Sequence, residues 1–238
     1  MAASGQPGTR VMPRDFLATD TLAAARHLIG AQLIRGSGPD ARGGRIVEVE
    51  AYIGLHDMAS HARFGRTKRN SVMFGPPGAA YVYLVYGMYH CLNVVTEADG
   101  RPAALLVRAL EPNLGQDEMR LARVRWATTR AGRRSAEAVE RAARNIEALP
   151  TTRLASGPGL VCAALSIDGA DGGIDLCDEA SELRLEIGVD DEPMAVATGP
   201  RVGIGYAPEP WRSRPWRFYV AGHASVSTAR SAPQRVET

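Results

Sequence analysis

Alternating apolar and polar residues predict a β-strand over residues 45–52. Three of its residues are β-branched, as is typical of strands. Side chains repeat every two residues along a strand, so Glu48, Glu50 and Tyr52 share one face. A carboxylate two residues from an aromatic ring suits a pocket in which Tyr52 contacts a flat ring and Glu50 activates a water molecule.

A second strand-like stretch, residues 81–89, holds four tyrosines and a glycine, Gly87, that can turn the chain. Five of the seven tyrosines in the chain lie in these two stretches. Asn93 follows shortly after, on a further predicted strand, where asparagine is depleted. The two stretches therefore concentrate the side chains that could bind a planar ligand.

Along the rest of the chain, the expected strands are grouped together and do not alternate with the expected helices. Helices are expected within residues 15–33 and over most of 115–149. The other expected strands are residues 32–35, 80–86, 91–96, 104–109, 183–187, 201–204 and 217–220. Because strands do not alternate with helices, we predict an α+β fold. The length suits one large domain as well as two, and no shift in composition marks a domain boundary. Residues 1–13 and 228–238 are predicted to be disordered tails.

Composition is typical of a soluble globular protein, with 45% hydrophobic and 23% charged residues and a net charge of +2. No apolar run approaches the roughly 20 residues that span a bilayer, and the N-terminus lacks the apolar stretch of a secretory signal. The three cysteines have no paired spacing, which favours a reducing, cytoplasmic compartment over a disulfide framework. Neither a metal nor a nucleotide cofactor is expected, because His56, Asp57 and His61 form only a weak ligand pattern and no glycine-rich phosphate motif is present.

Arginine provides almost all of the positive charge, since Lys68 is the only lysine. Residues 120–153 contain nine arginines and three glutamates. Glutamates 137 and 140 have helical spacing to arginines 141 and 144, which indicates a solvated helix. A phosphate-facing patch is expected from the arginines without close acidic neighbours. These are Arg120, Arg123, Arg125, Arg130, Arg133 and Arg134.

Each candidate also has a structural interpretation. Glu50 could pair with an arginine, the tyrosines could be core residues, and His61 could be an ordinary loop histidine. Residues 157–159, Gly-Pro-Gly, could form a turn or a close backbone approach to an anion. Taken singly, the residues leave these alternatives open.

Several motifs occur in order along the chain. They are Arg45–Tyr52, Ser60-His61, Arg69-Asn70, Met73-Phe74, Tyr81-Val82-Tyr83, Tyr86–Tyr89, Cys91–Asn93, Leu106–Pro112, Ser156-Gly157-Pro158 and Pro215–Val220. Together they resemble the alkyladenine (3-methyladenine) DNA glycosylase family over residues 14–222. The resemblance implies a single compact α+β domain over residues 14–223, with a mostly antiparallel or mixed sheet and surrounding helices. It also implies a monomeric, metal-free enzyme that flips damaged purines out of double-stranded DNA, excises them hydrolytically and leaves an abasic site.

The resemblance also implies roles for individual residues. Glu50 is the expected general base, and Arg108 is expected to help hold the catalytic water. Tyr52, His61 and Tyr83 should stack the extruded base, while Asn93 obstructs the 2-amino group of guanine. Tyr86 and Met88 are the expected intercalating residues. The expected phosphate contacts are Arg63, Arg66, Arg69, Arg133, Arg134, Gly157 and Gly159.

These roles agree with the chemistry. A base inside a duplex must rotate out before a hydrolase can reach its sugar, and aromatic rings then hold it by stacking. Alkylation makes a purine cationic and a good leaving group, and tyrosine faces favour a cation. A lyase mechanism through a Schiff base needs a lysine amine, and Lys68, in a predicted loop, is the only lysine of the chain. Such a mechanism is therefore not favoured. The rival interpretations are a non-catalytic damaged-DNA-binding protein and a small-molecule enzyme whose tyrosines are core residues.

Three positions depart from the family pattern. Leu160 stands where some relatives carry lysine, His90 where a bulky aromatic is more frequent, and Lys68 where proline is common. These departures bear on DNA affinity and on the range of lesions rather than on the class of reaction.

Overall fold

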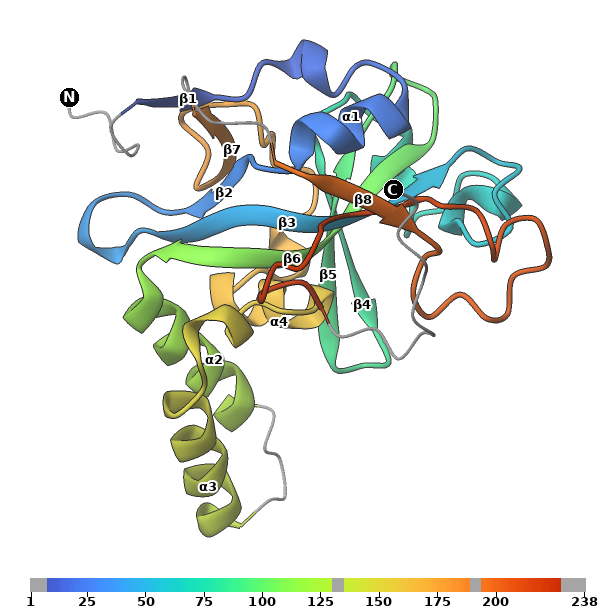
Figure 1. The fold of residues 1–238 in the computed structure, drawn as a ribbon. Coiled ribbons are helices and arrows are strands. Elements are labelled where there is room, and N and C mark those ends of the chain that lie inside the picture. Colours follow the sequence, from blue (N-terminus) through green and yellow to red (C-terminus); the bar gives the residue numbers. More distant parts are fainter. Residues whose placement is uncertain (1–7, 130–134, 189–193, 228–238) are drawn as a thin grey trace.

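An antiparallel sheet of nine strands organises the described part of the computed structural model, residues 8–129, 135–188 and 194–227 (Figure 1). Its main path runs β1-β7-β2-β3-β6-β5-β4, and β9 pairs with both β3 and β8. The strands are β1 (Thr9–Val11), β2 (Gln32–Arg35), β3 (Arg42–Ile53), β4 (Ala80–Val85), β5 (Tyr89–Val95), β6 (Ala103–Leu114), β7 (Leu183–Gly188), β8 (Val196–Gly199) and β9 (Arg217–Val220).

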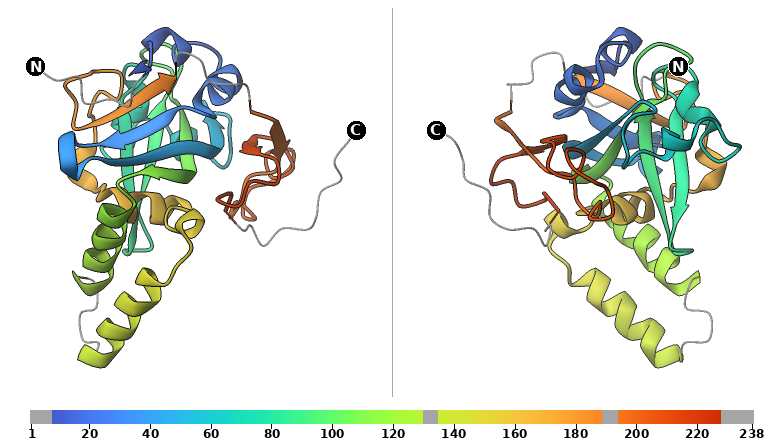
Figure 2. Two further views of the ribbon diagram at one scale, coloured as in Figure 1. Left: turned by 60° about the vertical axis from the view of Figure 1, so that its left-hand side comes forward. Right: turned by 90° about the vertical axis from the view of Figure 1, so that its right-hand side faces the viewer.

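Helices lie around this sheet. They are α1 (Thr21–Leu28), α2 (Gln116–Thr129), α3 (Ala136–Glu147) and α4 (Pro158–Leu165). Helix α4 packs against β5 and β6, while α2 and α3 form a hairpin that projects from the body (Figures 1 and 2). The predicted α+β class is therefore confirmed. Within the described ranges, no helix has the length and apolar character needed to cross a membrane.

Strands β3 and β6 form the centre of the sheet and carry much of the core. Val47 and Val49 are fully buried, as the alternating pattern predicts. The pairing of the two strands shifts three times, and the two shifts on either side of Glu48 skip Val47 on β3 and Arg108 on β6. A β-bulge re-aims a side chain, and here the Arg108 guanidinium reaches both Glu48 and Glu50.

The structure corrects several predicted boundaries. The helix expected within residues 15–33 is only α1, which begins after Asp20, whose side chain accepts from the backbone N–H groups of Leu22 and Ala23. The strand expected at residues 201–204 is absent from the described fold, and β8 lies just before it. Helix α4 was not predicted.

The domain is also wider than the predicted range 14–223. Residues 9–11, expected to be disordered, form β1 and pair with β7, and Met12 is buried. At the other end Ser225 and Ser227 are buried, and Ser227 bonds to Glu48 in the centre of the sheet. Both ends of the described chain therefore belong to the folded body, because they satisfy buried groups of the sheet.

Candidate active site

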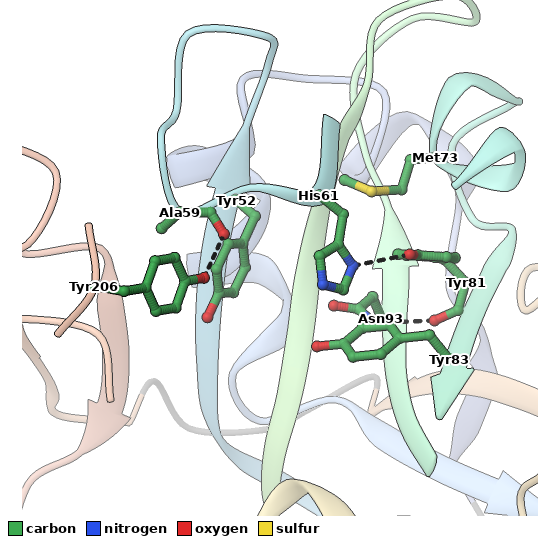
Figure 3. Close-up of a pocket in the computed structure, with 8 residues that line it drawn as sticks. All are labelled: Tyr52, Ala59, His61, Met73, Tyr81, Tyr83, Asn93 and Tyr206. Carbon is green, nitrogen blue, oxygen red and sulfur yellow. Dashed lines mark hydrogen bonds between the residues drawn. The ribbon is translucent and has the colours of Figure 1, made fainter. Parts of the chain in front are cut away.

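Aromatic side chains from several segments line a pocket of about 340 Å³, a volume that includes its open mouth (Figure 3). The structure brings together there all four residues predicted to bind a base: Tyr52, His61, Tyr83 and Asn93. It adds four that were not predicted: Ala59, Met73, Tyr81 and Tyr206. Tyr81 precedes Tyr83 by two residues and could have been inferred from the strand period, whereas Tyr206 comes from a distant loop without a pattern.

Strand geometry and hydrogen bonds fix one wall of the pocket. Tyr81 on β4 lies opposite Asn93 on β5, and the Asn93 amide donates to the Tyr81 backbone carbonyl at 3.0 Å. His61 Nδ1 lies 3.0 Å from the Tyr81 hydroxyl, and the His61 ring meets the Tyr83 ring edge-on at 4.5 Å between centroids. These contacts leave a histidine, two tyrosines and an amide grouped around the cavity (Figure 3).

The pocket wall is electrically neutral at physiological pH. Burial, together with Arg69 and Arg63, lowers the pKa of His61 to about 4. Burial raises the pKa of Tyr81 to about 12 and raises the pKa of Tyr83 still further. A neutral histidine does not repel a cationic ring, so the wall suits flat aromatic ligands whether neutral or positively charged.

Tyr52, on the opposite side of the pocket in Figure 3, is supported from behind. The Arg201 guanidinium lies 4.7 Å from the Tyr52 ring centroid and 5.0 Å from that of Trp216. The two terminal nitrogens of the Arg201 guanidinium donate to the two oxygens of the Asp57 carboxylate, at 2.6 and 2.9 Å. Asp57 is thus used in a buried ion pair, and Tyr52 keeps one ring face for a ligand.

Glu50 lies beside Tyr52 and is fully buried. The Tyr52 hydroxyl donates to Glu50 Oε2 at 3.0 Å, and the Val202 backbone N–H donates to Oε1 at 2.6 Å. Burial raises the pKa of Glu50, although Arg108 at 3.4 Å and these two donors oppose the shift. A carboxylate with a raised pKa, hydrogen-bonded to the pocket wall, has the properties of a general base.

Glu48 has the same buried position on the strand but different partners. It accepts from Arg108 Nε at 2.8 Å, from Arg217 Nε at 2.7 Å and from the Ser227 backbone N–H at 2.7 Å. Burial alone would raise the pKa of Glu48, but the two arginines and Ser227 outweigh it and lower that pKa. Neighbouring carboxylates whose pKa values are displaced in opposite directions are typical of a site that divides structural and proton-transfer roles.

The sequence model of the methylpurine-DNA glycosylase family matches residues 15–224. The chain belongs to the methylpurine-DNA glycosylase family.

Relatives agree over nearly the whole chain. Proteins named "Putative 3-methyladenine DNA glycosylase" are 44% identical in Methanocella arvoryzae, over 91% of this chain and 96% of theirs, and 44% identical in Anaeromyxobacter dehalogenans, over 93% and 88%. One from Bacillus cereus is 42% identical, over 90% of this chain and 98% of its own. The matched region includes the pocket and both glutamates.

In this member of the methylpurine-DNA glycosylase family, the β4–β5 hairpin ends in an exposed tyrosine. Tyr86 is 88% exposed and Met88 is 53% exposed. Tyr86 and Gly87 both have positive φ angles, 50° and 67°, and the Met88 N–H closes the turn onto the Val85 carbonyl at 3.0 Å. A bulky residue in the left-handed region is strained, so the turn holds Tyr86 outward at an energetic penalty.

The loop after β3 carries three arginines, and two of them, Arg63 and Arg69, contact rings of the pocket. Arg69 donates to the Leu84 carbonyl at 3.2 Å and lies 5.5 Å from the Tyr83 ring centroid. Arg66 is exposed, and Arg63 lies beside Tyr206. The loop thus carries positive charge to the mouth of the pocket.

The predicted arginine patch of residues 120–134 is wrong in part. Arg120 donates to the carbonyls of Ile146 and Glu147 at the end of α3, and Arg123 is buried against the carbonyls of residues 153 and 154. Arg123 is thus withdrawn from solvent, whereas Arg120 is half-buried, and both donate to carbonyls of the chain. Arg125 is exposed. Arg130, Arg133 and Arg134 lie outside the described residues.

Gly157 and Gly159 flank the start of α4. A Cβ on Gly159 would lie 2.4 Å from the Tyr89 ring, so packing requires glycine there. Gly157 has φ 133°, a conformation that favours glycine. A phosphate contact at this helix start stays a prediction.

Proposed function

We propose that the protein is a monofunctional DNA glycosylase that flips alkylated purines out of duplex DNA and hydrolyses their glycosidic bonds. The observation that carries the proposal is the contact between Glu50 and Tyr52, which joins a carboxylate of raised pKa to an aromatic pocket. Family membership supports the class of reaction, and the geometry of the pocket supports the proposed roles of the residues.

The pocket would bind the flipped base between Tyr52 on one side and His61 with Tyr83 on the other. Stacking contributes about 1–3 kcal/mol per base, which offsets the few kcal/mol of unstacking. Asn93, held by its bond to the Tyr81 carbonyl, would oppose a guanine 2-amino group. Because the wall carries no charge, deaminated purines, which are neutral, are proposed substrates as well.

In the hydrolytic step, a water molecule attacks C1′ of the sugar while the bond from C1′ to the purine nitrogen breaks. Glu50 accepts a proton from that water, the bonding electrons leave with the base, and an abasic sugar with a 1′-hydroxyl remains. Arg108, 3.4 Å from Glu50 Oε1, would help hold the water. Glu50 is fully buried. The hydrogen bonds of a general base often reach their catalytic geometry only in the complex with substrate.

Exposed residues around the pocket would bind the rest of the DNA. Tyr86 and Met88 would fill the gap that the flipped nucleotide leaves, and Arg63, Arg66 and Arg69 would contact phosphates. Gly157 and Gly159 would add backbone contacts at the start of α4, and Arg133 and Arg134 remain candidates from sequence alone. We propose that the protein acts as a monomer in the cytoplasm.

The test uses duplex oligonucleotides that each carry one lesion: hypoxanthine, 1,N6-ethenoadenine or 7-methylguanine. After incubation, alkali cleaves the strand at abasic sites, and gel electrophoresis measures excision. The proposal expects cleavage only in the lesion strand and only after alkali. Tight lesion binding without strand cleavage would favour the non-catalytic damage-binding alternative, and cleavage before alkali would contradict a monofunctional enzyme.

A further inference from the structure

Three aromatic rings are exposed among the described residues: Tyr86 at 88%, Phe64 at 78% and Tyr206 at 64%. The proposed function uses Tyr86, at the hairpin tip. Tyr206 lines the pocket, and Phe64 lies next to it through Arg63, which contacts both rings. These two rings have no part in the reaction described above.

Arg63 joins the two rings into one surface. Its guanidinium carbon lies 4.5 Å from the Phe64 ring centroid and 5.7 Å from the Tyr206 ring centroid. Arg63 also donates to the Ser60 carbonyl at 3.2 Å, and the Tyr206 hydroxyl donates to the Ala59 carbonyl at 3.2 Å. Backbone contacts therefore hold the ring–arginine–ring group in place, while the high exposure of Phe64 leaves ring surface open to solvent.

The charge of the surrounding loop indicates what binds there. Residues 54–70 contain four basic residues and one acidic residue, Asp57. Asp57 is buried and paired with Arg201, so its charge is compensated. A surface that combines stacking rings with uncompensated positive charge fits a nucleic acid strand, whose bases stack on aromatic rings and whose phosphates pair with arginine.

We propose that Arg63, Phe64 and Tyr206 form a second nucleobase subsite, which stacks an unpaired base of the lesion strand adjacent to the nucleotide in the pocket. The subsite rests on the proposed function, because that function places the lesion in the pocket. In a duplex the adjacent base stays paired and stacked, so it does not reach the subsite. In single-stranded or looped DNA the adjacent base is free, and the subsite contributes to binding.

Phe64 should therefore contribute to binding of single-stranded DNA, and Tyr86 to binding of duplex DNA. Phe64 contacts a base that only unpaired DNA offers. Tyr86 fills a gap that only duplex DNA contains. Substitution of each residue should weaken binding to one form of DNA and leave the other nearly unchanged.

The experiment measures binding of the full chain to fluorescein-labelled oligonucleotides with a central tetrahydrofuran abasic analogue, single-stranded or annealed. Phe64→Ala should weaken single-strand binding about 5- to 160-fold, the range for loss of one stacking ring, and duplex binding less than threefold. Tyr86→Ala should show the reverse. Phe64→Trp should retain single-strand binding, and Leu121→Ala, which removes an exposed side chain on α2, should change neither.

A 2-aminopurine next to the abasic analogue reports the contact directly. Its fluorescence in the single strand should be quenched by the wild-type protein and remain unquenched with Phe64→Ala. Equal losses on both forms of DNA, no loss on either, or no single-strand binding by the wild type would overturn the subsite. These readings require no excision, so a protein that binds and quenches but never cleaves would refute the proposed function and leave the subsite standing.

Discussion

Exchanging each buried glutamate of β3 for glutamine should separate catalysis from folding. Glu50→Gln should abolish excision while the protein stays folded and binds lesion DNA. Glu48→Gln, two residues away on the same strand face, should destabilise the fold. The two side chains are equally buried, so the difference must come from their partners.

The structure sets the expected magnitudes. At Glu50 the glutamine oxygen can still accept from the Val202 N–H, and burial already disfavours the charged form. Stability should therefore change by no more than about 1 kcal/mol, a typical size for a point substitution. Loss of the base should lower the excision rate by about 10²- to 10⁴-fold, the usual contribution of general base catalysis.

At Glu48 the exchange removes the charge that pairs with Arg108 and Arg217. Breaking a buried ion pair while its partners stay buried destabilises a protein by about 3–5 kcal/mol. For a domain of this size, with a shift of about 2–4 °C per kcal/mol, the melting temperature should fall by roughly 6–20 °C.

The assays are single-turnover excision from a lesion duplex, anisotropy with the same duplex, and thermal unfolding by circular dichroism. The reasoning fails if Glu50→Gln excises within threefold of the wild type, which would remove Glu50 as the base. It fails equally if the two variants lose the same amount of stability. The opposite directions of the Glu48 and Glu50 pKa shifts would then not correspond to any difference in the free energy of unfolding.

Four further predictions concern the site. Excision should decline as the pH falls through the pKa of Glu50, which burial raises above its usual value, while His61, with a pKa of about 4, stays neutral. If the residual excision of Glu50→Gln declines in the same way, another group is responsible. Since a raised native pKa stabilises a protein only at low pH, the stability of Glu50→Gln relative to the wild type should increase as the pH rises through that pKa; a constant difference in chemical denaturation would contradict this. Asn93→Ser should release guanine-type bases slowly, since one steric clash discriminates by about 10- to 200-fold; mass spectrometry of released bases that finds no guanine species would mean that Asn93 positions the substrate. Arg66→Ala should reduce the slope of log affinity against log salt by about one unit, whereas Leu121→Ala should not; an unchanged slope would mean that Arg66 does not contact phosphate.

Local patterns in the sequence predicted the centre of the site. The two-residue strand period predicted that Glu50 and Tyr52 share a face, and the structure joins them by a hydrogen bond. The pattern of residues 80–86 predicted the strand that became β4 with its tyrosines, and Gly87 predicted the turn that follows. These features depend on neighbouring residues only, so one sequence is sufficient to derive them.

Long-range partners could not be derived in this way. Ser227 bonds to Glu48 across 179 positions, and Arg201 pairs with Asp57 across 144. The alternating strand pattern alone does not distinguish Glu48 from Glu50. From the sequence alone, Asp57 looks like an unpaired carboxylate in a loop. Helix α4 was missed for a local reason: glycines flank Pro158, although proline at the first position of a helix was a usable signal.

The Ser227 contact has a consequence for synthesis. Domains begin to fold from the N-terminus while the ribosome adds about 5–20 residues per second. Glu48 and Arg108 emerge early, but Arg217 and Ser227 complete their network only when nearly the whole described chain has been made. A nascent chain thus has Tyr52, Tyr81 and Tyr83 of the pocket long before Arg217 and Ser227 can bind Glu48. Ribosome-bound chains stalled before residue 217 should therefore lack excision activity.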